Sequence, residues 1–80
     1  MTLDLSTLYA ATGTAKIAHL PAYEAEVKSS VPRGADVTLT GPGPVWLYLR
    51  LAHTLHGIAR SLRYDSPVTG SLVVFDHNPY

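Results

Sequence analysis

The sequence predicts a small α/β domain, a Rossmann-like or ferredoxin-like sheet of about five strands with one main helix. Its 80 residues are enough for one domain, so residues 1–80 are treated as a single unit. The stretch Asp36–Thr40 alternates polar and apolar residues, which is typical of a half-buried strand. A long apolar run then begins at Pro44 and ends at Gly57, which are common residues at the start and the end of a helix.

The first third of the chain has weaker patterns. Leucines separated by polar residues in Leu3–Leu8 predict a short strand. Thr14–His19 is predicted to be a second strand, which Pro21 would end. Glu24–Ser30 is predicted to be a short helix.

The remainder predicts a strand–helix–strand unit. After a turn at Pro32–Gly34, the predicted elements are the strand Asp36–Thr40, the helix Pro44–His56, and the strands Ser61–Asp65 and Ser71–Asp76. Two strands joined by a helix within about 30 residues form a βαβ unit, whose strands are parallel. The loop at 40–44 and the end of the strand Ser61–Asp65 should therefore meet at the carboxyl edge of the sheet, where open α/β sheets bind ligands.

The loop Gly41–Pro44 has features of an anion site. The unpaired N–H groups of the first helical turn attract anions, and the glycines let the backbone approach a ligand closely. Arg50 and Arg63 are either solvated charges or groups that neutralise phosphates, and the pattern alone leaves both readings open.

Four ionisable side chains are candidates for chemistry. His53 and His56 are neighbours on one helix face, whereas Asp65 and His77 stand at the ends of the last two strands. Histidine beside a carboxylate suits general acid–base catalysis, and imidazoles with a carboxylate also suit Mn²⁺ or Zn²⁺. The alternatives are surface or interface histidines and an aspartate that opens the turn at 66–70.

The helix Pro44–His56 is apolar nearly all round, so we expect it to be covered on more than one side. The chain is 46% hydrophobic and only 15% charged, and it contains no cysteine that could form a disulfide. These features favour oligomerisation. Trp46 and Tyr48 are expected in the core or at an interface.

The charge balance limits the partners. The formal net charge is zero, which argues against non-specific duplex DNA binding, because that requires clustered basic residues. The longest apolar stretch, Val45–Leu49, is far too short to span a membrane, and we see no signal peptide. We therefore expect no membrane partner and a cytoplasmic location.

Part of the chain resembles a known family. The run T-G-P-G-P-V-W-L-Y-L-R-L-A-H-T-L-H, followed by Y-D before a turn and then by V-V-F-D-H, is similar to the small CRISPR-associated family called Csx-three. The similarity spans Thr40–His77. Members of that family are ring nucleases, accessory proteins of type III CRISPR antiviral defence and distant relatives of the CRISPR-associated Rossmann fold.

The resemblance implies a phosphodiesterase that degrades the second messenger cyclic tetra-adenylate, or short oligoadenylate RNA, and requires Mn²⁺. It implies self-association as a homodimer or homotetramer, in which dimers sandwich the ligand. The catalytic histidine of the family corresponds to His56, and its other site residues correspond to His53, Asp65 and His77. We therefore expect His56, Asp65 and His53 to be catalytic, and His56, Asp65 and His77 to be the ligands of any metal. The glycine turn of the family corresponds to Gly41–Gly43, and with our own candidates the expected substrate-binding residues are Gly41, Gly43, Pro44, Arg50 and Arg63.

One departure from the family bears on the arginines. The family often carries an arginine two residues after the aspartate, whereas here Pro67 stands in that place. Arg63, two residues before Asp65 on the same strand face, is the candidate replacement.

Several alternatives stay open. His56, oriented by Asp65, could activate the attacking hydroxyl directly, or a metal held by these residues could do so; the attacker could be a ribose 2′-OH. A different hypothesis is a non-catalytic, dimeric module that binds cyclic oligoadenylate without cleaving it. A third is a dimerisation domain without a ligand.

Overall fold

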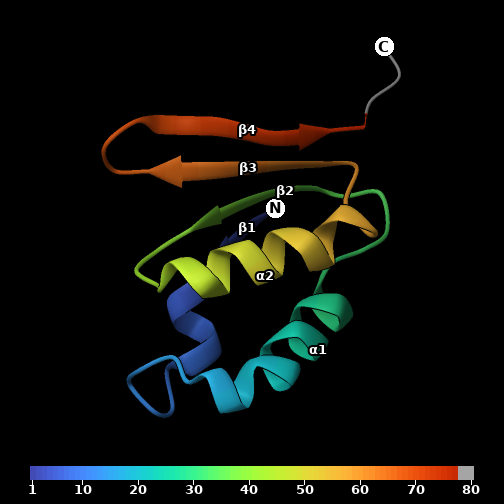
Figure 1. Cartoon of the computed structure of the whole chain (residues 1–80). Helices are drawn as coiled ribbons and strands as arrows, with labels where there is room; N and C mark the ends of the chain where they lie inside the picture. Colours follow the sequence, from blue (N-terminus) through green and yellow to red (C-terminus); the bar gives the residue numbers. More distant parts are fainter. Residues whose placement is uncertain (78–80) are drawn as a thin grey trace.

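The computed structural model describes residues 1–77, and in this part of the chain a four-stranded mixed sheet packs against two α-helices (Figure 1). The elements in chain order are β1 (Thr2–Asp4), η1 (Leu5–Tyr9), η2 (Ile17–His19), α1 (Leu20–Ser30), β2 (Asp36–Thr40), α2 (Val45–His56), β3 (Ser61–Ser66) and β4 (Gly70–Asp76), where η marks a 3₁₀-helix.

The strand order in the sheet is β1-β2-β3-β4. The first three strands are parallel, and β4 pairs antiparallel with β3. Each helix connects two neighbouring parallel strands, and both connections step across the sheet in the same direction. Crossovers of one hand that step in one direction place their helices on the same face. Figure 1 shows α1 and α2 together on one side of the sheet.

Helix α2 covers the middle of the sheet. Its residues Leu47, Leu51 and Leu55 follow an i, i+4, i+8 spacing and are 0% exposed. They share one cluster with the inward-facing strand residues Leu3, Val37, Leu39 and Leu62. Burying a leucine side chain of this size contributes about 1.5–3 kcal/mol, so this seam is the main source of stability.

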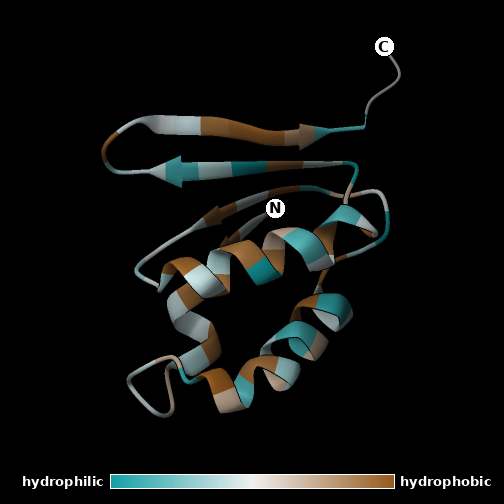
Figure 2. Cartoon of the chain, in the orientation of Figure 1, coloured by the Kyte–Doolittle hydropathy of each residue, from teal (hydrophilic) through white to brown (hydrophobic). Residues whose placement is uncertain are grey.

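The other face of the sheet carries no helix. Along β2, Val37 and Leu39 are buried. The residues that alternate with them, Asp36, Thr38 and Thr40, remain at least partly exposed. This alternation is the period of a strand with only one covered face. Figure 2 shows the apolar stretch of β4 at the free edge of the sheet, where Leu72, Val73 and Val74 are about half exposed.

Polar contacts join α1 to α2. The Glu24 carboxylate on α1 accepts hydrogen bonds from the Arg50 guanidinium at 3.1 Å and from the Thr54 hydroxyl at 2.9 Å. Thr54 is nearly buried, so its hydroxyl needs this partner.

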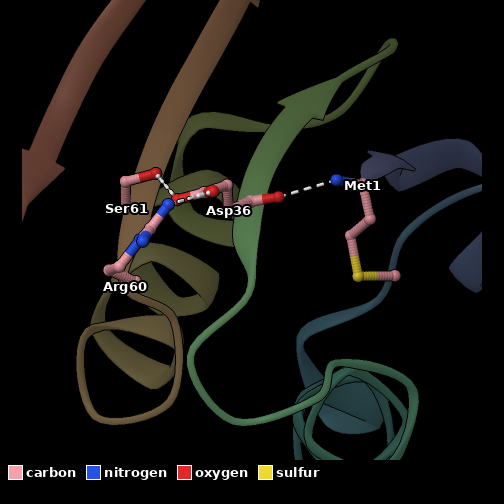
Figure 3. A network of polar contacts seen from close by, with 4 residues as sticks. All are labelled: Met1, Asp36, Arg60 and Ser61. Atoms are coloured by element: carbon pink, nitrogen blue, oxygen red, sulfur yellow. Dashed lines mark hydrogen bonds and ion pairs between the residues drawn. The ribbon is translucent and has the colours of Figure 1, made fainter.

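A second polar network fixes the amino ends of β2 and β3 (Figure 3). The Asp36 carboxylate accepts from the Arg60 guanidinium at 2.7 and 3.2 Å and from the Ser61 hydroxyl at 2.7 Å. The Met1 ammonium donates to the Asp36 carbonyl at 2.6 Å. The hydrogen bond from Arg60, followed by that from Ser61, lowers the pKa of Asp36 below its ordinary value.

The predicted βαβ unit is confirmed. Strand β2 has the predicted bounds and pairs parallel with β3, so that Val37 lies beside Leu62. Strand β3 extends one residue beyond its predicted end, to Ser66, and β4 begins one residue before its predicted start, at Gly70. Pro44 is the N-cap of α2 and not its first helical residue, and its carbonyl accepts from the N–H groups of Leu47 and Tyr48.

Within residues 1–77 the sheet has four strands where the sequence predicts about five, and α1 accompanies the predicted main helix α2. Thr14–His19 is not a strand: its end forms η2, and Ile17 is 68% exposed. The predicted strand Leu3–Leu8 ends at Asp4, whose carboxylate accepts from the Ser6 N–H and caps η1. Helix α1 begins at Leu20 and not at Glu24. Pro21, taken as the end of a strand, lies in the first turn of this helix, where a missing N–H is tolerated.

The seam under α2 can be tested with two leucines of the same helix. We expect Leu51→Ala to lower the free energy of unfolding by about 2–5 kcal/mol, because Leu51 is 0% exposed. Leu49→Ala is the matched control, with a side chain 65% exposed and an expected change within about 0.5 kcal/mol. Urea denaturation at low protein concentration measures both, and equal losses would contradict the packing described.

Candidate functional site

A pocket of about 590 Å³ opens at the carboxyl edge of β2 and β3. The Thr40 hydroxyl donates to the Asp65 carbonyl at 3.3 Å, which joins the ends of the two strands. The sequence prediction that the loop at 40–44 and the end of β3 share one edge is therefore confirmed. The pocket is lined by Thr40, Gly41, Pro42, Gly43, Tyr48, Tyr64, Asp65, Ser66 and Pro67.

Two tyrosine hydroxyls hold the loop that forms one wall of this pocket. The Tyr48 hydroxyl donates to the Gly41 carbonyl, and the Tyr9 hydroxyl donates to the Pro42 carbonyl. The Tyr48 ring also contacts the Tyr64 ring edge to face, with centroids 5.0 Å apart. Burial, followed by the nearby Tyr64, Asp4 and Tyr9, raises the pKa of Tyr48, so its hydroxyl keeps its proton and remains a donor.

The two loop glycines lie close to other parts of the protein itself. Gly41 has φ of +95°, and a methyl group there would overlap the Asp4 carboxylate. A methyl group at Gly43 would lie 3.3 Å from the Leu5 side chain. The close approach in this chain is therefore partly to its own η1 segment, which explains both glycines without a ligand.

Neither candidate arginine lines the pocket. Arg50 is paired with Glu24 on α1. Arg63 borders a separate polar hollow of about 280 Å³ beside Asp36 and Arg60, on the face of the sheet that has no helix. Among the described residues, Asp65 is the only carboxylate that lines the pocket, and no lysine or arginine does.

The histidines gather at the opposite edge. The rings of His56, at the end of α2, and His77, after β4, are 4.7 Å apart between centroids and nearly perpendicular. Phe75 contacts both rings, at 5.1 and 4.8 Å. The His77 N–H donates to the Arg60 carbonyl at 2.8 Å, which fixes the backbone there. His53 is exposed, one turn before His56.

Within one chain, Asp65 is not brought to these histidines. Asp65 pairs with Ser71, whereas Ser61, four residues earlier in β3, pairs with Asp76 next to His77. Four residues of strand span about 13 Å. The reason lies in the topology: α2 returns to the amino edge of the sheet, and the antiparallel β4 ends there too.

This separation bears on the implied metal site. Within residues 1–77, no three histidine, aspartate or glutamate side chains gather as metal ligands do. His56, Asp65 and His77 of a single chain therefore do not fit as joint ligands of Mn²⁺.

An apolar groove of about 260 Å³ runs between α2 and the last two strands. Val45 and Leu49 on α2 are 73% and 65% exposed, and Leu72 on β4 is 55% exposed. Helix α2 thus presents apolar residues on a second side, as its sequence predicts. The groove is lined by Leu39, Val45, Tyr48, Leu49, Ala52, Leu62, Tyr64, Leu72 and Val74.

Sequence reasoning missed the tyrosines of the site. Tyr9 precedes Pro42 by 33 residues and directly follows the predicted strand Leu3–Leu8, and the sequence predicts Tyr48 only in the core or at an interface. Tyr64 adjoins Asp65, and this adjacency is the one signal that could have placed it at the pocket.

The α/β domain thus has two layers and a pocket at the carboxyl edge of its parallel strands, the edge at which open α/β sheets bind ligands. The model of one family, described as CRISPR-associated protein (Cas_csx3), matches residues 14–80, so the chain belongs to this family. Its function is therefore CRISPR-associated. A search of the curated proteins found no match, and a search of the solved structures found none either. No helix in residues 1–77 has the length and apolar character needed to cross a membrane.

The loop can be tested by adding one methyl group. We expect Gly41→Ala to lower the free energy of unfolding by about 1–3 kcal/mol, because alanine is strained at positive φ and its methyl displaces Asp4. Gly57→Ala is the matched control, since Gly57 has a negative φ and open space around its Cα. Chemical denaturation should show little change or a gain for Gly57→Ala, and a similar tolerance at Gly41 would contradict the loop geometry.

Proposed function

We propose that this protein is a ring nuclease, a phosphodiesterase that opens and degrades cyclic tetra-adenylate in type III CRISPR defence. Membership in the CRISPR-associated family supports the biological setting. The observation that carries the chemistry is the contact between the His56 and His77 rings. Two imidazoles side by side are the groups that RNA cleavage needs for moving protons at neutral pH.

The proposed reaction uses a hydroxyl of the substrate itself. His56 takes the proton of a ribose 2′-OH, and the 2′-oxygen attacks the adjacent phosphorus. The bond from phosphorus to the 5′-oxygen breaks, and an imidazolium, that of His77, returns a proton to this leaving oxygen. The products are a 2′,3′-cyclic phosphate and a 5′-hydroxyl, so that atoms and charges balance.

The pocket at the other edge would hold the substrate. Its N–H groups at the start of α2 are suited to a phosphate, and the Asp65 carboxylate is suited to accept from a ribose hydroxyl or to orient an imidazole. Because Asp65 and His56 lie at opposite edges of one chain, the working site would combine the pocket of one copy with the histidine pair of another. The groove along α2 supports a second copy, since a homodimer or homotetramer would cover its apolar residues.

Mn²⁺ remains part of this proposal on the strength of the family alone. A metal ion would polarise the phosphate and stabilise developing charge. Its ligands would have to come from two copies, because one chain does not gather them. The proton transfers above are therefore written for His56 and His77 alone.

A second candidate function is a dimeric module that binds cyclic oligoadenylate without cleaving it. The separation of Asp65 from the histidines favours it, as does the absence of an arginine two residues after Asp65. The two functions differ in a single measurement, which is turnover of the bound ligand.

Turnover can be tested with labelled cyclic tetra-adenylate, with and without Mn²⁺. We expect linear products carrying a 2′,3′-cyclic phosphate. His56→Ala should lower the rate about 10²–10⁴-fold with ligand affinity largely kept, because it removes a proton acceptor and not a binding contact. His19→Ala, at an exposed histidine on η2, is the control and should cleave at the wild-type rate. Binding without products would support the second candidate, and cleavage by His56→Ala at the wild-type rate would remove His56 from the mechanism.

A site shared between copies can be tested by mixing inactive variants. In a symmetric dimer of His56→Ala with Asp65→Asn, one of the two composite sites carries both wild-type groups. With random exchange, half of the dimers are mixed and half of their sites are intact, so we expect about one quarter of the wild-type rate. Mixing His56→Ala with His77→Ala should restore nothing, because both groups come from the same copy. No recovery in the first mixture would contradict the shared site.

A further inference from the structure

The carboxyl-edge pocket is bordered by backbone N–H groups without protein acceptors. Within residues 1–77, the N–H groups of Gly43, Val45 and Trp46 make no hydrogen bond, whereas those of Leu47 and Tyr48 donate to the Pro44 carbonyl. Pro42 and Pro44 have no N–H at all. Gly43, which lines the pocket, therefore supplies the unpaired donor of this loop nearest to the helix; the N–H of Gly41 also makes no hydrogen bond within residues 1–77.

The direction of the Gly43 N–H depends on a tyrosine. The peptide between Pro42 and Gly43 is trans, and in a trans peptide the carbonyl oxygen and the following N–H point in opposite directions. The Tyr9 hydroxyl holds the Pro42 carbonyl, so the Gly43 N–H must point away from Tyr9. Tyr9 itself is not part of the pocket lining.

Tyr48 fixes the preceding peptide in the same way. Its hydroxyl donates to the Gly41 carbonyl, one residue before the carbonyl that Tyr9 holds. Two consecutive carbonyls are thus turned toward the protein by hydroxyls that come from η1 and from α2. The glycines of this loop permit many conformations and its prolines fix φ at two positions only, so these two hydrogen bonds help to select its shape.

We propose that Tyr9 and Tyr48 are positioning residues of the ligand site: they turn the carbonyls of Gly41 and Pro42 inward and so aim the Gly43 N–H at a phosphate group of the ligand. This assignment rests on the proposed function for the identity of the ligand. Without the two hydroxyls, a peptide flip would present a carbonyl oxygen where the phosphate needs a donor. The negative ends of two dipoles would then face an anion.

Phenylalanine substitutions test this assignment, because they keep each ring and remove only the hydroxyl. The first readout is the amide signal of Gly43 in ¹⁵N NMR spectra, with its hydrogen-exchange rate. The second is the affinity for cyclic tetra-adenylate, followed through the same signals. Tyr23→Phe is the matched control, since the Tyr23 hydroxyl accepts from the Lys16 N–H in the helical layer and makes no contact with the loop.

For Tyr9→Phe we expect a shifted Gly43 amide signal and about 3–10-fold weaker binding, the value of one hydrogen bond. Tyr48→Phe should shift the same signal and weaken binding to a similar extent. Tyr23→Phe should lower only thermal stability. A wild-type Gly43 signal with wild-type affinity in both loop variants would overturn the assignment.

The outcome separates this assignment from the proposed function. If the wild-type protein does not bind cyclic tetra-adenylate, the proposed function fails, and so does the assignment to that ligand. The Gly43 signal then still shows whether the tyrosines set the loop. If the wild-type protein binds cyclic tetra-adenylate, and the phenylalanine substitutions at Tyr9 and Tyr48 change neither the Gly43 signal nor the affinity, then only the assignment fails.

Discussion

The structure depends on the packing of one helix, α2, against the middle two strands of the sheet. Leu47, Leu51 and Leu55 are removed from solvent there, and so are Val37 and Leu62 beneath them. This contact does more than stabilise the domain. A helix of 12 residues is about 18 Å long and reaches from one edge of the sheet to the other. It therefore fixes the glycine loop at the carboxyl edge and His56 at the amino edge.

That geometry divides the candidate functional groups into two sets. The pocket with Asp65 forms one set, and the His56–His77 pair forms the other. A reaction that used Asp65 together with His56 or His77 would need a second copy, because one chain keeps them at opposite edges of the sheet. The apolar side of α2 and the half-exposed residues of β4 offer a surface for it, because water contact there is unfavourable.

The loop shows how contacts that are distant in sequence give a defined shape to a segment with little preference of its own. Its glycines permit many conformations, and its prolines remove two of its donors. The hydrogen bonds from the Tyr9 and Tyr48 hydroxyls, and the contact of the Asp4 carboxylate with Gly41, restrict the loop to one of these conformations. The site is therefore built from η1, β2, α2 and β3 together, and a change in any one of them alters the pocket wall.

The sequence by itself determined the parts whose signals are local and strong. The alternation in Asp36–Thr40 and the apolar run after Pro44 specify the βαβ unit, since hydrophobic period and caps act within a few residues. The motif of Thr40–His77 correctly indicated the CRISPR-associated family. The tertiary structure decided the rest. It turned Thr14–His19 into an irregular segment with a 3₁₀ turn that joins no strand of the sheet. It also separated Asp65 from the histidines, placed Arg50 against Glu24 and brought Tyr9 to the loop. These outcomes depend on strand direction and on which helix face meets which neighbour, and no spacing along a single chain encodes either.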